Sequence, residues 1–156
     1  MARRRRAIKR AIKADTKFES TMVGRLITTV MKSGKRSTAE SIVYGAIDLS
    51  NEKKDGNPLE TLQKAIDNAK PRLEVKSRRV GGATYQVPME VTPERQQSLA
   101  LRWMVTYAAK RKGVAMKKAL ATEIKEAASG QGNAVKKRDD VHKMAQANRA
   151  FAHLRF

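Results

Sequence analysis

The sequence predicts a mainly α-helical single domain in which one β-hairpin protrudes between the third and fourth of about six helices. Three observations lead to this prediction. Apolar residues recur at helical spacing in several separate stretches, which is typical of amphipathic helices. Only the stretch 72–90 alternates as strands do, and a Gly81-Gly82 pair divides it at a point that suits a hairpin turn. The length of 156 residues fits one domain with a modest core.

The charge of the chain indicates a polyanionic partner. Its net charge is +19, and such a field favours nucleic acid over most other partners. Residues 1–40, 75–112 and 113–156 carry +9, +6 and +5, whereas residues 41–74 carry −1. We therefore expect the partner on one side of the domain. No apolar run reaches the roughly 20 residues of a membrane span, so no membrane partner is predicted. Cysteine is absent, which excludes disulfides and thiolate metal sites.

Residues 1–17 are predicted to form a basic N-terminal arm, and residues 18–156 the helical domain with its hairpin. The arm holds eight basic residues and one acidic residue, so we expect it to be disordered when free. It could serve as a solubilising tail or fold along phosphates on binding. Four consecutive arginines favour the second role, because guanidinium groups pair bidentately with phosphate oxygens.

Three helices are expected before the hairpin. The first begins near Ser20 and ends at Gly34, and its apolar stripe comprises Met22, Val23, Leu26, Ile27, Val30 and Met31. The second begins at a capping box of Ser37 and Glu40, ends at Asp55-Gly56, and buries Ile42, Val43, Ala46, Ile47 and Leu49. The third begins at Asn57 as N-cap with Pro58 at its first position, and Pro71 ends it.

A two-residue turn at Gly81-Gly82 fixes a register for the hairpin. It places Arg79 opposite Thr84 and Arg78 opposite Tyr85. Lys76, Arg78 and Arg79 would then project from both faces, and such a ribbon can enter a groove or follow a nucleic-acid backbone. Edge strands also carry charge simply to avoid aggregation. The basic neighbouring segments favour the binding role.

Three helices are expected after the hairpin. The fourth begins with Thr92 as N-cap and Pro93, runs to about Lys112, and buries Leu99, Ala100, Trp103, Met104, Tyr107 and Ala108, with Trp103 interpreted as a central core residue. The fifth buries Met116, Leu120, Ile124 and Ala127 and ends at 129–132. The sixth begins at Asn133 and turns Val141, Met144, Ala145 and Phe151 inward.

Catalysis has little support in the sequence. The two histidines, His142 and His153, are eleven residues apart, and no glycine-rich phosphate loop follows a strand. No His or carboxylate cluster has metal-ligand spacing. We therefore predict no catalytic residue, no metal and no cofactor, and we interpret His142 as a surface histidine beside basic residues.

Residues 76–111, KSRRVGGATYQVPMEVTPERQQSLALRWMVTYAAKR, resemble the signature of the bacterial type of the small-subunit ribosomal protein seven family. The C-terminal run GNAVKKRDDVHKMAQANRAFAHLRF and the arginine-rich start resemble the same family. The resemblance covers essentially the whole chain. It implies a helical domain with a protruding ribbon, in agreement with the elements expected above.

The resemblance also implies a function and partners. Members of this family are cytoplasmic ribosomal proteins that bind the 3′ major (head) domain of small-subunit ribosomal RNA and start assembly of the head. They lie at the subunit interface near the exit tRNA site and contact ribosomal protein eleven at the platform. Some bacterial members repress their own operon by binding its messenger RNA, so own mRNA is a further expected partner.

The family's RNA surface can be carried over residue by residue onto this chain. It comprises the arm, the loop between the first two helices, the ribbon and the fourth helix, with further cations in the last helix and tail. The RNA-binding residues expected from it are Arg3, Arg4, Arg5, Arg6, Lys9, Arg10, Lys35, Arg36, Lys76, Arg78, Arg79, Arg95, Arg102, Lys110, Arg111, Lys136, Lys137, Arg138 and Arg149.

Two other functions fit the composition less well. An architectural DNA-binding protein could use a basic ribbon in the minor groove, but the ribbon tip, 80–83, lacks the large apolar wedge that such proteins insert. A membrane-surface protein would need exposed aromatic anchors opposite a basic face. The sequence lacks such anchors. Aromatic residues make up only 4% of the chain, which also disfavours a single-strand binder built on stacking platforms.

Overall fold

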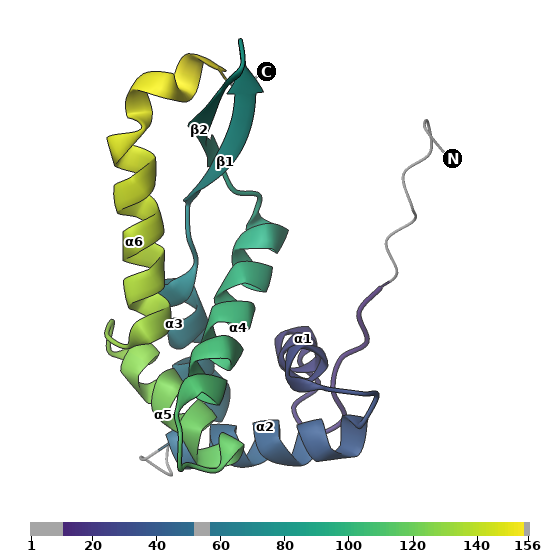
Figure 1. Cartoon of the computed structure of the whole chain (residues 1–156). Coiled ribbons are helices and arrows are strands. Elements are labelled where there is room, and N and C mark those ends of the chain that lie inside the picture. Colours follow the sequence, from purple (N-terminus) through teal and green to yellow (C-terminus); the bar gives the residue numbers. More distant parts are fainter. Residues whose placement is uncertain (1–10, 52–56, 155–156) are drawn as a thin grey trace.

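The computed structural model describes residues 11–51 and 57–154. In this part of the chain there are six α-helices, a terminal 3₁₀ helix and one antiparallel hairpin that extends from one end of the molecule (Figure 1). The elements are α1 (Thr21–Val30), α2 (Arg36–Ser50), α3 (Pro58–Ala69), β1 (Leu73–Val80), β2 (Ala83–Glu90), α4 (Pro93–Lys110), α5 (Met116–Ala128), α6 (Asn133–Ala147) and η1 (Arg149–Leu154). The predicted fold class is confirmed.

The core lies at the helical end of the molecule, with α5 at its centre. This helix packs against α2, α3 and α4. Its Leu120 and Ile124 are fully buried, as are Ile47 of α2 and Leu62 of α3. The hairpin extends from the opposite end of α4 and lies beside α6 and η1 (Figure 1). It contributes one buried apolar residue of its strands, Val87, so the helices form the core almost without it.

Helix starts follow the expected chemistry at α3 but not at α2. The Asn57 side chain accepts a hydrogen bond from the Leu59 amide at 3.0 Å, as an N-cap should. At α2 the predicted capping box is wrong, because the helix begins at Arg36 and places Ser37 inside the first turn. Glu40 pairs instead with Arg36 at 2.7 Å, an i,i+4 contact. The helix ends at Ser50, before the predicted Asp55.

The buried face of α4 differs from the predicted stripe. Trp103 and Tyr107 are only half-buried at the edge of the core, whereas Leu101 is 1% exposed. The reason is that α4 packs against α1 on one side and against α5 and α6 on others. A helix with several neighbours buries a wider arc than one stripe describes. Two further expected core residues, Leu49 and Met144, are 45% and 43% exposed.

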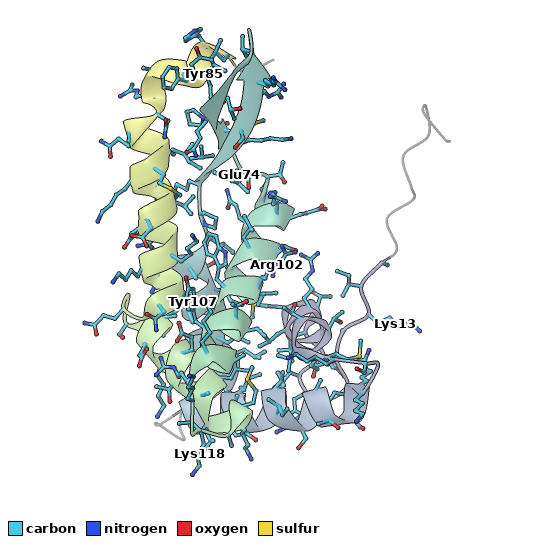
Figure 2. The ribbon with its side chains drawn as sticks, viewed as in Figure 1. Lys13, Glu74, Tyr85, Arg102, Tyr107 and Lys118 are labelled. Carbon is cyan, nitrogen blue, oxygen red and sulfur yellow. The ribbon has the colours of Figure 1, made fainter. Side chains whose placement is uncertain are left out.

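The hairpin has the register that its glycine turn predicts. Arg79 lies opposite Thr84 and Arg78 opposite Tyr85, with Gly81 and Gly82 both at positive φ. Because opposed residues share a face, Lys76 and Arg78 lie with Tyr85, whereas Arg79 lies on the other face. The Tyr85 ring contacts the Phe151 ring of η1 at a centroid distance of 5.2 Å. This contact braces the ribbon near its tip (Figure 2 labels Tyr85 there).

The chain is held against α1 before residue 18, within the segment expected to belong to the arm. Asp15 is 3% exposed, and its carboxylate accepts amide hydrogen bonds from Lys17, Phe18 and Ser20 at 2.8–3.1 Å. A Cβ added at Gly24 would lie 2.7 Å from the Lys13 carbonyl oxygen. The close approach of the segment therefore requires glycine in α1. The arginine-rich residues 1–10 lie outside the described residues.

Candidate nucleic-acid interface

The turn between α1 and α2 presents one cluster of cations. Lys35 is exposed at the N-cap of α2, and Lys32 lies three residues before it, also exposed. Gly34 has a φ of 73°, which allows the tight reversal between them. Arg36 is held by Glu40, but half of its side chain is exposed, and such a surface pair contributes little stability. Arg36 can therefore exchange its carboxylate for a phosphate.

The hairpin presents a second cluster. Arg79 and Lys76 are exposed, and Arg78 is half-buried on the face that carries Tyr85. Between residues 75 and 89 the sequence has no carboxylate. The only acidic residues of the hairpin are Glu74 and Glu90 at its base, and Glu74 binds Arg95 of α4. The hairpin that carries the cations extends beyond the end of α4, with α6 and η1 along one side, so a large anionic partner can reach its other sides (Figure 1).

A third cluster lies along α4, on the side that faces α1. Two adjoining hollows of about 260 and 330 Å³ share Glu94 and Ser98 as lining residues, and together they run from Arg102 to Arg25 of α1. Arg102 is exposed there (Figure 2). Arg95 is also exposed, but its guanidinium binds Glu74 at 2.9 Å, and this hydrogen bond raises the pKa of Arg95. The α4 surface is thus basic but partly neutralised.

Two arginines expected to bind RNA are held by the protein itself. Arg111 donates to Glu123 at 2.8 Å and to Glu126 at 2.5 Å, and these hydrogen bonds, that to Glu126 first, raise the pKa of Arg111. Arg138 donates to the Asn68 carbonyl and to Asp139. Both side chains are 26% exposed. In this structure their guanidinium groups join helices.

The remaining expected cations lie outside these three clusters. Lys110 is exposed and lies over the Tyr107 ring at 5.3 Å. Lys136 and Arg149 are exposed, and Lys137 is half-buried. These last three belong to α6 and η1, on the opposite side of the molecule from α1 (Figure 1). The structure therefore does not bring them together with the α1–α2 turn. The arm residues Arg3, Arg4, Arg5, Arg6, Lys9 and Arg10 lie outside the described residues.

Two basic residues of this surface were missed by the sequence reasoning. Arg25 lines the hollow between α1 and α4, where its Nη1 donates to Gln97 Oε1 at 2.6 Å. Lys32 stands at the α1–α2 turn. In the sequence the two residues are seven apart, the spacing of one face of a predicted helix, although α1 ends at Val30, before Lys32. The same spacing singled out Arg95 and Arg102, so this signal was present.

His142 is not the free surface histidine that the sequence suggested. Its Nε2 accepts a hydrogen bond from the Arg72 amide at 2.9 Å, which ties α6 to the start of β1. Burial and the charge of Arg138 lower the pKa of His142. Its ring therefore acts as a structural acceptor. Within residues 11–51 and 57–154 no group of three or more His, Cys, Asp or Glu is placed to hold a metal, and no helix is long and apolar enough to cross a membrane.

Comparisons with known proteins agree on one kind of protein. The family model described as "Ribosomal protein S7p/S5e" matches residues 2–149. A curated protein of Akkermansia muciniphila named "Small ribosomal subunit protein uS7" is 64% identical over 157 residues, which cover 100% of both chains. Proteins of the same name from Sorangium cellulosum and Marinobacter nauticus are 54% and 56% identical, again over 100% of both chains.

Proposed function

Because the chain belongs to the ribosomal protein S7p/S5e family, we propose that it is a primary RNA-binding protein of the small ribosomal subunit. It binds the 3′ major domain of the ribosomal RNA and starts assembly of the head. The family consists of structural ribosomal proteins rather than enzymes. The chain therefore acts in the cytoplasm of bacteria as part of the translation machinery, with binding as its biochemical activity.

The observation that carries this proposal is the full-length identity of 64% to a small-subunit ribosomal protein. The structure supports it through the placement of its free cations. The hairpin and the α1–α2 turn present Arg79, Lys76 and Lys35 to solvent, whereas the carboxylates of the chain neutralise cations within the helical body. Phosphate contacts of this kind supply affinity and orient a protein on its RNA.

Two further contacts follow from the family and fit the shape of the molecule. The hairpin is proposed to lie near the exit tRNA site, because its ribbon extends past α4 and can reach an RNA that the helical core does not touch (Figure 1). The helix α6 and η1 are proposed to face ribosomal protein eleven at the platform. They lie on the side away from α1 and expose Lys136 and Arg149.

Repression of the chain's own operon is part of the same proposal. A messenger RNA that folds to resemble the ribosomal target would bind the same cations, so one surface would serve both RNAs. A competition binding assay tests whether the two RNAs share one surface. Operon messenger RNA should displace the 3′ major-domain RNA from the protein, and simultaneous binding of both RNAs would contradict a shared surface.

The test is binding to a transcript of the 3′ major domain against an unrelated structured RNA of equal length. We expect preferential binding to the first, with an affinity that falls steeply with salt, as when roughly 6–10 phosphates are neutralised. Footprinting should place the protein within the head domain. Equal affinity for both RNAs, or affinity that does not change between low and moderate salt, would contradict the proposal.

A matched pair of variants tests the role of the hairpin. Arg79→Glu reverses an exposed charge on the ribbon, and Lys118→Glu makes the same change on α5, at the opposite end of the molecule (Figure 2). Both variants change the net charge equally. We expect Arg79→Glu alone to weaken RNA binding and to disturb tRNA occupancy at the exit site. Equal losses from the two variants would mean that only net charge matters.

A further inference from the structure

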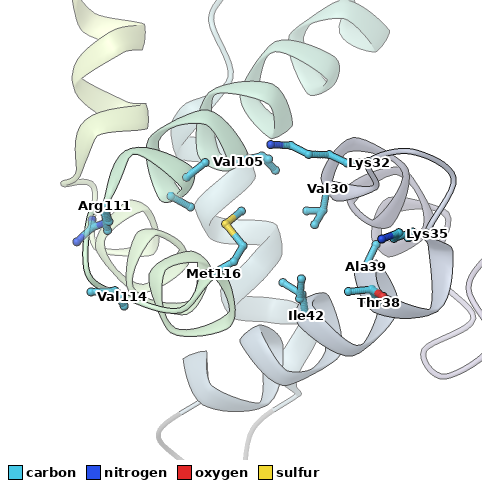
Figure 3. Close-up of a pocket in the computed structure, with 12 residues that line it drawn as sticks. Val30, Lys32, Lys35, Thr38, Ala39, Ile42, Val105, Arg111, Val114 and Met116 are labelled. Atoms are coloured by element: carbon cyan, nitrogen blue, oxygen red, sulfur yellow. The ribbon is translucent and has the colours of Figure 1, made fainter.

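An apolar pocket lies between the α1–α2 turn and the junction of α4 and α5. Its volume is about 340 Å³, at the lower end of the range of about 300–1,000 Å³ for small-molecule sites. Met116 stands at its centre, with Ile42 and Val105 on either side (Figure 3). Val114, 48% exposed, forms part of its rim. A flat, weakly polar group could pack against these apolar side chains.

The polar groups around the pocket are almost all hydrogen-bond donors. Lys32 and Lys35 stand at its mouth on the side of α1 and α2, and Lys32 extends over the opening towards α4 (Figure 3). Within the described residues neither ammonium group has a carboxylate partner. Arg111 lines the far side, where its guanidinium is held by Glu123 and Glu126, so the two lysines are the cations left for a ligand. Two unpaired ammonium groups beside an apolar wall favour an anionic ligand that also carries an apolar surface.

These two properties select one occupant. An unstacked nucleobase has two apolar faces and an edge of acceptors, such as O6 and N7 of guanine, which pair with Lys or Arg. The phosphates on either side of it would meet Lys32 and Lys35. An acidic protein segment would also satisfy the lysines, but it would bring flexible carboxylates rather than a flat apolar body. RNA-binding proteins commonly read bases that are turned out of loops in this way.

We propose that this pocket holds one unstacked nucleobase of the RNA bound at the α1–α2 turn. The proposal rests on the RNA-binding function above and adds a site of base contact to a surface otherwise built for phosphates. The apolar walls hold the faces of the base, and the donors of Lys32 and Lys35 meet its edge and its neighbouring phosphates. The pocket thus contributes affinity that salt does not screen.

The experiment fills the pocket without touching the core. Ala109 lines it from the exposed side of the last turn of α4, and Ala109→Leu adds bulk there with little effect on helix propensity. The matched control is Ala147→Leu, an exposed alanine at the end of α6. We expect Ala109→Leu to weaken binding to the 3′ major-domain transcript roughly tenfold, as loss of one stacked base does, with an unchanged salt slope. Ala147→Leu should bind like the parent.

A second variant separates a loss of RNA binding from a loss of folding, because the pocket is blocked after the protein has folded. Because the chain has no cysteine, Val114→Cys places a single thiol at the rim of the pocket. Alkylating the folded variant with N-ethylmaleimide should weaken its RNA binding relative to the same variant before alkylation. Ultraviolet cross-linking of the parent complex should join a base to the peptide that contains Met116.

The outcomes are distinguishable. If Ala109→Leu and the alkylated protein both bind the transcript as tightly as the parent, the pocket holds no base and the inference is wrong, although the proposed function stands. If they bind RNA normally but enter reconstituted subunits poorly, the pocket takes a protein segment, which also overturns the inference. If the parent itself does not prefer the transcript, the proposed function fails first.

Discussion

Glu123 is predicted to be the carboxylate on which the joint of α4, α5 and α6 depends. It is 0% exposed, accepts from Arg111 at 2.8 Å, and accepts from the Ala134 amide at the start of α6 at 3.0 Å. Glu123→Gln keeps the shape and an acceptor for Ala134. Its amide, however, turns a donor towards Arg111, so the charge of the guanidinium loses one buried partner.

The magnitude follows from what Arg111 retains. Removing one partner of a fully buried pair costs about 3–5 kcal/mol. Arg111 keeps Glu126 and is 26% exposed, so we expect about 2 kcal/mol for Glu123→Gln. For a chain of this size each kcal/mol lowers Tm by about 2–4 °C, which gives a fall of about 4–8 °C. Urea denaturation followed by circular dichroism measures the free energy of unfolding, and a thermal scan measures Tm.

The control is Glu126→Gln, which makes the same change at a carboxylate that also binds Arg111. Glu126 is 36% exposed, so the expected cost is at most about 1 kcal/mol. The two variants differ mainly in burial and in the Ala134 contact. Equal losses of stability in both would refute the reasoning that burial makes Glu123 decisive.

Three other outcomes are expected. Deleting residues 1–10 should weaken RNA binding and leave Tm nearly unchanged, because this arginine-rich stretch lacks an apolar stripe to bury, and the contacts at Gly24 and Asp15 come from later residues; a large fall in Tm would show that the deleted residues stabilise the fold. Trp103→Ala should cost about 1–2 kcal/mol by urea denaturation rather than the 3–5 of a fully buried aromatic residue, and a larger loss would contradict its position at the edge of the core. The pKa of His142 is lowered in the folded protein. The contribution of neutral His142 to the free energy of unfolding is therefore complete above the ordinary pKa of about 6.5, and it is lost as pH falls through the lower pKa of the folded state. His142→Gln, which keeps an acceptor for Arg72, should remove that part of the pH dependence of stability, and an unchanged pH profile would exclude His142 as its source.

The hairpin could be predicted in detail because its determinants are local. Gly81 and Gly82 fix the turn, the turn fixes the register, and the register decides which cations share a face. Helix starts were predicted well where a short-range signal acts alone, as at Asn57. Where two local signals competed, as Arg36 and Ser37 did for Glu40, the sequence alone did not decide between them.

The sequence could not predict which cations are held in ion pairs and which are free, because their partners come from distant parts of the chain. Arg138 binds the carbonyl of Asn68, seventy residues away, and Arg111 binds carboxylates twelve and fifteen residues away. Nothing in the local sequence separates these arginines from Arg79, which is exposed on the ribbon. The pocket beside Lys35 was equally hidden, because four separate elements line it.

The distribution of carboxylates explains why a basic chain can have both a stable core and a free RNA surface. Glu123 and Glu126 hold Arg111, and Asp139 holds Arg138, at joints between helices. The ribbon from 75 to 89 has no carboxylate, and among the described residues no ion pair holds its cations, which leaves them available to an external anion. When the ribbon binds RNA, its cations replace the counterions condensed on the phosphates. No ion pair within the part of the chain that the structure describes has to break for this exchange. The ribbon can thus bind phosphate without weakening the fold that supports it.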